Sequence, residues 1–364
     1  MGLRLRLTTR ARLATVLLLW CVGAPAVSAA QASPVGNDSA RKTTKSTLFD
    51  DQSVLRFTLT ADFRQFKHDA RNDDAPYRPA KISYSNEGQT VIVPVKIKPR
   101  GIWRRKNCDL PPIRLNFAKD SAKHTVFAKH SRLKLVVTCK NGDDYEQYVL
   151  QEFQLYRVQN ILTPLSFRAR LVHVTYIDTQ KGDTIQSRYA FLGEEPEDAA
   201  KRLGGTSLQL KGAHGDDLEP AASAMFGLFQ YFIGNTDFSV SGLHNVLLLR
   251  KDSVVWEAFP IARDFDWTGA VNAKYAFPDY RLPIKNVTQR LMKGDCVPPE
   301  TFNGAFDIFR AKKDAIYALY RDSLAAPLKP DVVRWTLKYF DEFYEVINDK
   351  RQAKREIVGA CGPS

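Results

Sequence analysis

The alternation of hydrophobic and polar positions divides the chain into a first half with the pattern of β-strands and a second half with the pattern of helices. Segments in which apolar and polar residues alternate recur up to residue 192, and a period of two is typical of strands with one buried face. The pattern predicts strands at 55–59, 81–84, 90–97, 113–117, 133–137, 167–177 and 188–192. We expect the early strands to form an antiparallel sheet.

Apolar residues recur at helical spacing in most of the remaining segments. Helices are expected at 144–161, 196–203, 220–233, 283–292, 299–310, 312–324 and 330–347. A sheet-rich part followed by a helix-rich part is typical of the α+β class. We therefore predict two lobes, with residues 53–195 in the first and 196–364 in the second.

One stretch, residues 234–269, combines strand patterns with polar ends. Apolar runs at 246–249 and 254–259 predict a β-hairpin. The polar residues at its two ends are Asp237, Asn245, Asp264 and Asp266. Because the two ends of a hairpin lie side by side, we expect these side chains to gather in one place. Carboxylate and amide oxygens are hard ligands, suited to Mg²⁺ or Mn²⁺ that carries the phosphates of a nucleotide.

Each of these polar residues also has an ordinary structural explanation. Asp237 can cap a turn, and Asn245 can satisfy a backbone group at the start of a strand. Asp264 and Asp266 can belong to an acidic loop, and His244 is expected to be a packed, hydrogen-bonded side chain. Their joint position around one hairpin favours a metal site, because crowded carboxylates repel one another unless a cation is present.

Two charged residues of opposite sign lie within apolar patterns. Glu152 lies on the apolar face of the predicted helix 144–161, and Lys134 lies inside the predicted strand 133–137. A buried charge is costly unless it is paired. We predict that Lys134 and Glu152 pair with each other; alternatively, each side chain reaches solvent independently.

The first thirty residues are expected to be a secretory signal peptide. A cluster of Arg precedes the apolar run 13–22, and small residues follow at 26–30. Residues 31–52 are rich in Ser, Thr and Lys, which predicts a disordered leader. The apolar run is too short to span a bilayer comfortably. We therefore predict a secreted or periplasmic protein with no membrane span after cleavage of the signal.

The composition is that of a globular protein, with 44% hydrophobic and 26% charged residues. The formal net charge is +13, and removal of the four Arg of the signal segment leaves +9. This charge suits acidic partners or polyphosphates. We do not infer nucleic-acid binding, because no recognised nucleic-acid module accompanies the charge.

Four cysteines remain after removal of the signal segment, an even number in an oxidising compartment. We pair Cys108 with Cys139, because both lie next to neighbouring predicted strands, and Cys296 with Cys361 as the remaining two. No spacing of Cys and His indicates a zinc site.

The order of the candidate residues along the chain resembles that of the protein-kinase-like superfamily. The interval between Lys134 and Glu152 is similar to that between the strand lysine and the helix glutamate of those enzymes. The motifs GNTD, HN and DFD, at 234–237, 244–245 and 264–266, resemble those of atypical kinases of the HipA and CotH types. The CotH family, often secreted, is the closer match, since Arg100-Gly101 resembles its Arg-Gly turn. The resemblance covers about residues 55–310.

The resemblance implies a two-lobed protein-kinase-like fold with an antiparallel-sheet N-lobe and a mainly helical C-lobe. It also implies transfer of the ATP γ-phosphoryl group to a protein or another hydroxyl acceptor, in the cell envelope or outside it, with Mg²⁺ or Mn²⁺.

The resemblance assigns a role to each candidate residue. Lys134, held by Glu152, would contact the α- and β-phosphates, and Asp237 would orient or deprotonate the acceptor hydroxyl. Asn245 and Asp264 would hold the metal, with Asp266 as a competing ligand. Arg100 would neutralise phosphate charge, or is a surface arginine of a turn. The segment 189–195, with Glu194, would form the hinge against which adenine packs.

The chain also departs from the family pattern. It has no typical glycine-rich phosphate loop and no HRD motif, and Lys96, Arg114 and Lys140 are rivals for the role of Lys134. Three alternatives stay open: a catalytically inactive kinase-like binding module of the cell envelope, an AMP transferase, and a hydrolase that uses the acidic residues directly. No Gly-x-Ser-x-Gly or HExxH motif supports other classes of hydrolase.

Overall fold

The structure is a computed structural model that describes residues 48–251 and 256–362, and these residues belong to one compact unit. The predicted signal peptide and most of the predicted leader lie outside the described residues, as do residues 252–255 of the predicted hairpin.

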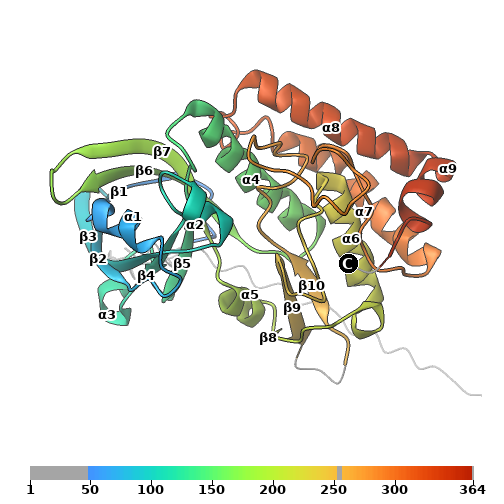
Figure 1. Cartoon of the computed structure of the whole chain (residues 1–364), viewed down its shortest axis with the longest axis horizontal. Helices are drawn as coiled ribbons and strands as arrows, with labels where there is room; N and C mark the ends of the chain where they lie inside the picture. The colour runs from blue at the N-terminus through green and yellow to red at the C-terminus, as the bar shows by residue number, and fades with distance from the viewer. Residues whose placement is uncertain (1–47, 252–255, 363–364) are drawn as a thin grey trace, which may run out of the picture. The chain divides into compact units, whose positions relative to one another are not determined.

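Seven strands form a closed barrel in the order β1-β2-β3-β4-β5-β7-β6 (Figure 1). Neighbouring strands are antiparallel except β1 and β6, which are parallel and close the barrel. The strands are β1 (Leu55–Ala61), β2 (Arg78–Asn86), β3 (Gln89–Pro99), β4 (Ile113–Asn116), β5 (Arg132–Val136), β6 (Ala169–Asp178) and β7 (Thr184–Gly193).

The predicted kinase-like fold, with an antiparallel-sheet N-lobe and a mainly helical C-lobe, is wrong, because the sheet is closed and mixed. Closure depends on the register that pairs Leu55 with Val172 and continues to Ala61 with Asp178. The period of two along a strand shows which side chains are buried, but it does not show which strand lies beside which. A parallel pairing between segments so distant in sequence leaves no local signal.

Alternate side chains of the strands fill the barrel interior with apolar residues such as Leu59, Val93 and Leu115, each fully buried. Leu48 and Phe49 pack into the same core. The prediction of a disordered leader is therefore wrong for its last residues, whose apolar side chains belong to the barrel.

Three short helices accompany the barrel: α1 (Phe63–Asp69), α2 (Trp103–Asn107) and α3 (Lys119–Ala122). The sequence pattern predicted none of them, and α2 begins just after the Arg100-Gly101 turn. Helices of this length have too few positions for a helical period to stand out.

The second core is formed by the helices and by a three-stranded sheet in the order β10-β9-β8. Its sheet consists of β8 (Gly205–Leu208), β9 (Val246–Lys251) and β10 (Phe259–Ala262). Its helices are α4 (Asp143–Leu162), α5 (Pro196–Arg202), α6 (Pro220–Ile233), α7 (Pro299–Ala318), α8 (Pro330–Asn348) and α9 (Lys350–Ala353), with short turns at η1 (Gly215–Asp217) and η2 (Lys354–Val358). Helix α4, which we assigned to the first lobe, packs its buried side chains into this second core.

Two helix predictions in this part are corrected. Residues 283–292 are irregular, because side chains there bind the local backbone: Gln289 Oε1 accepts from the N–H groups of Lys285 and Asn286. Such bonds compete with helix formation. In place of the helices predicted at 299–310 and 312–324 there is one helix, α7, which ends at Ala318; no Gly or Pro interrupts residues 305–318.

Both predicted disulfides are confirmed: Cys108 is bonded to Cys139, and Cys296 to Cys361. Two disulfides are compatible with an extracellular or periplasmic protein. Among the described residues, no helix has both the length and the apolar character needed to cross a membrane.

The two ends of the stretch 234–269 are locked together by glycines. Helix α6 ends at Gly234, whose φ of 64° is left-handed, and the Gly269 N–H donates to the Gly234 carbonyl over 2.9 Å. A Cβ atom on Gly269 would lie 2.4 Å from Tyr339 Oη and 2.5 Å from the Val287 carbonyl oxygen. Only glycine leaves room at this position for the segments that carry Tyr339 and Val287 to approach so closely.

We expect Gly269→Ala to lower the free energy of unfolding by about 1–3 kcal/mol, because the added methyl group must displace backbone as well as the Tyr339 hydroxyl. Urea unfolding measures the change. Gly304→Ala is the matched control, since it lies in α7 with nothing within 4 Å of the new Cβ, and we expect it to be neutral or stabilising. Equal effects of the two substitutions would contradict this account.

Candidate functional site

The hairpin of β9 and β10 places its two polar ends side by side, as predicted. Ala262 pairs with Val246, and the Arg263 N–H donates to the Asn245 carbonyl over 3.1 Å. The second strand begins at Phe259, later than the pattern indicated. Asn245 and Asp264 therefore flank the same end of one strand pair.

A cavity of about 670 Å³ opens at this end of the hairpin. We call it the basic cavity, because arginines from several segments line it. The predicted site residues that line it are Arg100, Glu152, Asp237, Asn245, Asp264 and Asp266. The structure thus brings together residues that are scattered along the sequence.

Asp264 and Asp266 lie on either side of a buried aromatic residue, Phe265. The ring of Phe265 is fully buried and lies 4.6 Å from the ring of Tyr156, centroid to centroid. Asp264 has a left-handed φ of 58°, and its N–H donates to Tyr156 Oη over 3.0 Å. Non-glycine residues with such backbone angles are uncommon and cluster at functional sites.

Lys134 forms an ion pair with Asp264, with 3.4 Å between Nζ and Oδ1. Burial lowers the pKa of Lys134 to about 8, although the charge of Asp264 opposes this change. Burial by itself would raise the pKa of Asp264, but Lys134, Arg100 and Arg263 hold it well below its ordinary value. Asp264 is therefore ionised at neutral pH.

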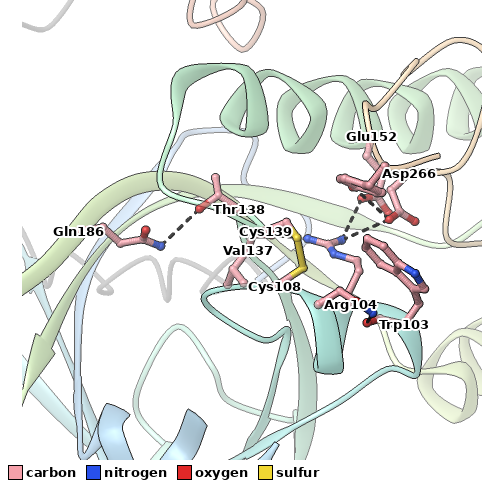
Figure 2. Close-up of a disulfide and its surroundings, with 11 residues drawn as sticks. Trp103, Arg104, Cys108, Val137, Thr138, Cys139, Glu152, Gln186 and Asp266 are labelled. Carbon is pink, nitrogen blue, oxygen red and sulfur yellow. Dashed lines mark hydrogen bonds and ion pairs between the residues drawn. A yellow bond between two sulfur atoms is a disulfide. The ribbon is translucent and has the colours of Figure 1, made fainter.

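The partner of Glu152 is Arg104 rather than the predicted Lys134. Arg104 Nη1 lies 3.8 Å from Glu152 Oε2 and 3.7 Å from Asp266 Oδ2 (Figure 2). Its Nη2 donates to the Val137 carbonyl, which fixes the guanidinium beside the Cys108–Cys139 disulfide. Sequence reasoning missed Arg104 because it stands in a run of three basic residues, and only the turn of α2 determines which of them reaches the acids.

Glu152 and Asp266 share one guanidinium. Burial and the charge of the neighbouring Asp266 raise the pKa of Glu152 to about 8, against the attraction of Arg104. Burial also raises the pKa of Asp266, against the attraction of Arg104. The two carboxyl groups therefore retain a proton more readily than Asp264 does.

The described part of the chain contains no group of three His, Cys, Asp or Glu side chains that could hold a metal ion by themselves. A divalent cation at the predicted ligands would need oxygen atoms from another molecule. Mg²⁺ is commonly bound in this way, by one or two carboxylates together with the phosphates of a substrate.

Asp237 is held in place by neighbours on both sides. Its carboxylate accepts from Asn245 Nδ2 over 3.0 Å and lies 3.0 Å from His244 Nε2, while its N–H donates to Asn235 Oδ1 over 2.9 Å. The hydrogen bond to Asp237 raises the pKa of His244. Because the amide nitrogen of Asn245 is engaged by Asp237, its amide oxygen is the atom that could bind a cation.

Lys293 supports the same segment and was not predicted. Its Nζ donates to the carbonyl oxygens of Thr236, over 3.2 Å, and of Phe238, which are the residues on either side of Asp237. Burial lowers the pKa of Lys293. A lysine in an irregular segment gives no sequence signal that it binds a distant backbone.

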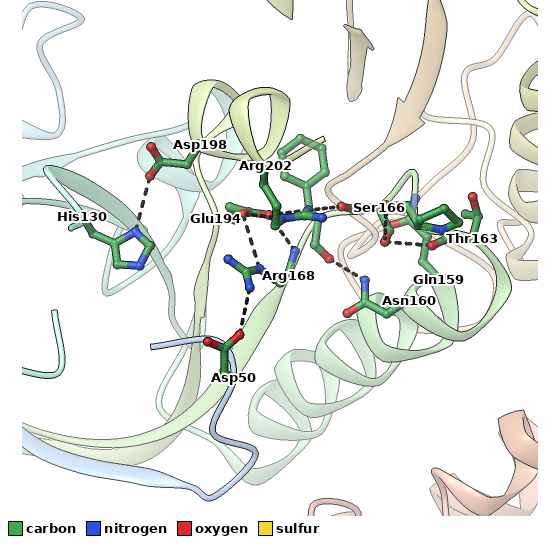
Figure 3. A network of polar contacts seen from close by, with 12 residues as sticks. Asp50, His130, Gln159, Asn160, Thr163, Ser166, Arg168, Glu194, Asp198 and Arg202 are labelled. Carbon is green, nitrogen blue, oxygen red and sulfur yellow. Dashed lines mark hydrogen bonds and ion pairs between the residues drawn. The ribbon is translucent and has the colours of Figure 1, made fainter. Parts of the chain in front are cut away.

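Glu194 is not among the residues that line the basic cavity. Its carboxylate accepts from Arg202 Nε over 2.9 Å and from the Arg168 N–H over 3.1 Å, in a network that ties the end of β7 to α5 (Figure 3). Residues 189–193 lie in β7, within the barrel wall. Contact of this segment with adenine stays a prediction.

Two arginines at the basic cavity act on Asp264 through their charge but form no direct ion pair. Within the described residues, Arg100 and Arg263 form no ion pair, and the Nε atom of each is buried without a hydrogen-bond partner. A buried donor without a hydrogen-bond partner is costly. An anion that enters the cavity would remove this cost.

Comparison with models of known protein families and with curated protein sequences finds no match to this chain. The resemblance to CotH-like kinases therefore stays a prediction that depends on the motifs themselves.

We expect the stability of the metal-free protein to depend on pH through Glu152. Between about pH 4.5 and pH 8 the unfolded chain has lost this proton, whereas the folded protein retains it, so the free energy of unfolding falls as the pH rises. Glu152→Gln removes the dependence. Melting temperatures measured in EDTA across this window should shift in favour of the variant as the pH rises, and a constant difference would refute the assignment.

Proposed function

We propose that the basic cavity binds the polyphosphate of ATP and that the protein transfers the γ-phosphoryl group to a hydroxyl acceptor. The observation that carries the proposal is that Arg100 and Arg263 line the cavity without a direct ion pair among the described residues, while their charges and that of Lys134 all act on Asp264. Guanidinium groups bind phosphate oxygens through charge-assisted hydrogen bonds. We therefore assign to Arg100 the phosphate-binding role that the resemblance implies.

The residues at the hairpin ends fit a divalent cation that arrives with the nucleotide. The ionised carboxylate of Asp264 and the amide oxygen of Asn245 are both hard ligands. Asp266 is engaged by Arg104 and by Tyr275 Oη, 3.2 Å away, so we assign the principal ligand role to Asp264. When bound, Mg²⁺ or Mn²⁺ would neutralise charge that develops on the phosphates.

Asp237 is proposed to accept the proton of the acceptor hydroxyl. In the transfer, the bond between the acceptor oxygen and the γ-phosphorus forms and the bond from that phosphorus to the bridging oxygen breaks. The hydroxyl proton passes to the Asp237 carboxylate, and ADP leaves. The bonds from Asn245 and His244 orient this carboxylate, so that catalysis depends on positioning and on charge neutralisation.

The reaction is proposed to take place outside the cytoplasm. Two disulfides support an exported protein, as does the predicted signal peptide. The acceptor is then a component of the cell envelope or its surroundings.

We expect the wild-type protein to bind ATP at least about tenfold more tightly with Mg²⁺ or Mn²⁺ than in EDTA, a difference of about 1.4 kcal/mol. Asp264→Asn should abolish this dependence on metal, because it removes the ionised ligand. Isothermal titration calorimetry measures both affinities.

Asp69→Asn is the matched control, since Asp69 is also buried and paired with a cation, Arg78, but does not line the basic cavity. It should keep metal-dependent binding. Absence of nucleotide binding to the folded wild type with either metal would remove the basis of the proposal. Mass spectrometry of the acceptor would distinguish transfer of phosphate from transfer of AMP.

The two disulfides allow a second comparison. Replacing either pair by serine should lower the free energy of unfolding by about 2–4 kcal/mol. Only Cys108→Ser with Cys139→Ser should also weaken ATP binding, because this disulfide adjoins both α2, which carries Arg104, and β5, which carries Lys134. Equal ATP affinities of the two double variants would show that the disulfide does not support the cavity.

A further inference from the structure

A second cavity, of about 620 Å³, adjoins the basic cavity. The two share Asp237, His244 and Trp267 as lining residues. The proposed proton acceptor therefore faces both spaces. A molecule in the second cavity, which we call the acceptor cavity, would lie beside Asp237.

The two cavities differ in the pairing of their cations. The basic cavity includes two arginines, Arg100 and Arg263, that form no direct ion pair among the described residues. The charged residues of the acceptor cavity are balanced: two acids, Asp237 and Asp279, and two bases, Arg281 and Lys293, with His244 beside Asp237. Lys293 is engaged by backbone carbonyls. This balance favours an electrically neutral occupant over a phosphate, an acidic peptide or a basic one.

Aromatic rings form one wall of the acceptor cavity. Trp267 and Phe277 lie 4.7 Å apart, centroid to centroid, in an edge-to-face arrangement. Phe277 is 59% exposed, so much of its ring is available to a molecule in the cavity. The exposed face of one aromatic ring suits the C–H face of a sugar ring.

A polar pair at the same cavity suits the hydroxyl groups of such a ring. Asp279 Oδ1 accepts from Arg281 Nε over 2.9 Å and from the Arg281 N–H over 3.0 Å. The paired groups retain further acceptor and donor positions for neighbouring hydroxyls. Rings on one side and paired polar groups on the other match the two surfaces of a carbohydrate.

The backbone around the acceptor cavity does not suit an extended peptide. The residues that line it come from irregular segments, and none of these described residues belongs to a helix or to a named strand. Addition of a peptide strand requires an exposed strand edge. The cavity therefore offers side chains rather than a row of backbone groups.

We propose that the acceptor cavity binds a neutral carbohydrate and that one of its hydroxyl groups is the phosphate acceptor. The identity of the acceptor rests on the proposed function, whereas binding of the carbohydrate does not. The hydroxyl oxygen forms a bond to the γ-phosphorus and its proton passes to Asp237, so the products are a sugar phosphate ester and ADP.

Two measurements test the proposal with the full mature chain. Saturation-transfer NMR without nucleotide detects binding of glucose, galactose, mannose, N-acetylglucosamine and cellobiose. Mass spectrometry after incubation with ATP and Mg²⁺ detects phosphorylation of these sugars, with a neutral serine-containing peptide as the competing acceptor. We expect at least one sugar to bind and to gain phosphate.

Phe277→Ala should weaken sugar binding about fivefold or more, because it removes an exposed ring of the cavity wall. Tyr280→Ala is the matched control: Tyr280 is a neighbouring aromatic residue, 94% exposed, that does not line the cavity. It should leave sugar binding unchanged, and both variants should keep their ATP affinity and melting temperature.

The outcomes separate this proposal from the proposed function. Sugar binding without ATP binding would support the carbohydrate site and refute the phosphotransferase. ATP binding with no bound sugar, unchanged sugar binding in Phe277→Ala, or phosphate on the peptide alone would each overturn the carbohydrate proposal.

Discussion

The ion pair between Lys134 and Asp264 joins the barrel to the hairpin, and the candidate site depends on it. The two residues are 130 positions apart in sequence, and each is charged in a place where burial opposes the charge. Each charge makes the other tolerable, and breaking such a pair leaves an uncompensated buried ion. The pair thus fixes the strand that carries Lys134 against the acidic segment.

The acidic residues of the site differ in their protonation and in their partners. Glu152 and Asp266 have raised pKa values and share the guanidinium of Arg104. Asp264, in contrast, is ionised and surrounded by the positive charges of Lys134, Arg100 and Arg263. Asp237 lies between these charges and a space of balanced charge, held by side chains of the hairpin and by Lys293. Polar groups with so many fixed partners need little rearrangement when a ligand arrives.

Local patterns in the sequence were sufficient to predict most of the strands and long helices and part of the candidate site. The periods of two and of 3.6 located most strands and long helices, and the polar ends of one predicted hairpin identified Asn245 and Asp264 as neighbours. The partner of Glu152 and the closure of the barrel could not be predicted, because both depend on contacts between distant segments. The helix expected at 283–292 is absent for a related reason. Hydrogen bonds from local backbone N–H groups to the side chain of Gln289 outweigh the helical spacing of apolar residues in this segment.

The parallel pairing of β1 with β6 also sets an order of assembly. The first strand of the barrel has an unpaired edge until residues 169–178 are available, so more than a hundred residues must emerge before the cylinder is complete. Long-range pairing of this kind is slow and leaves strand edges open to wrong partners in the meantime. A chain of this design is therefore most vulnerable to aggregation early in its biogenesis, before β6 has arrived.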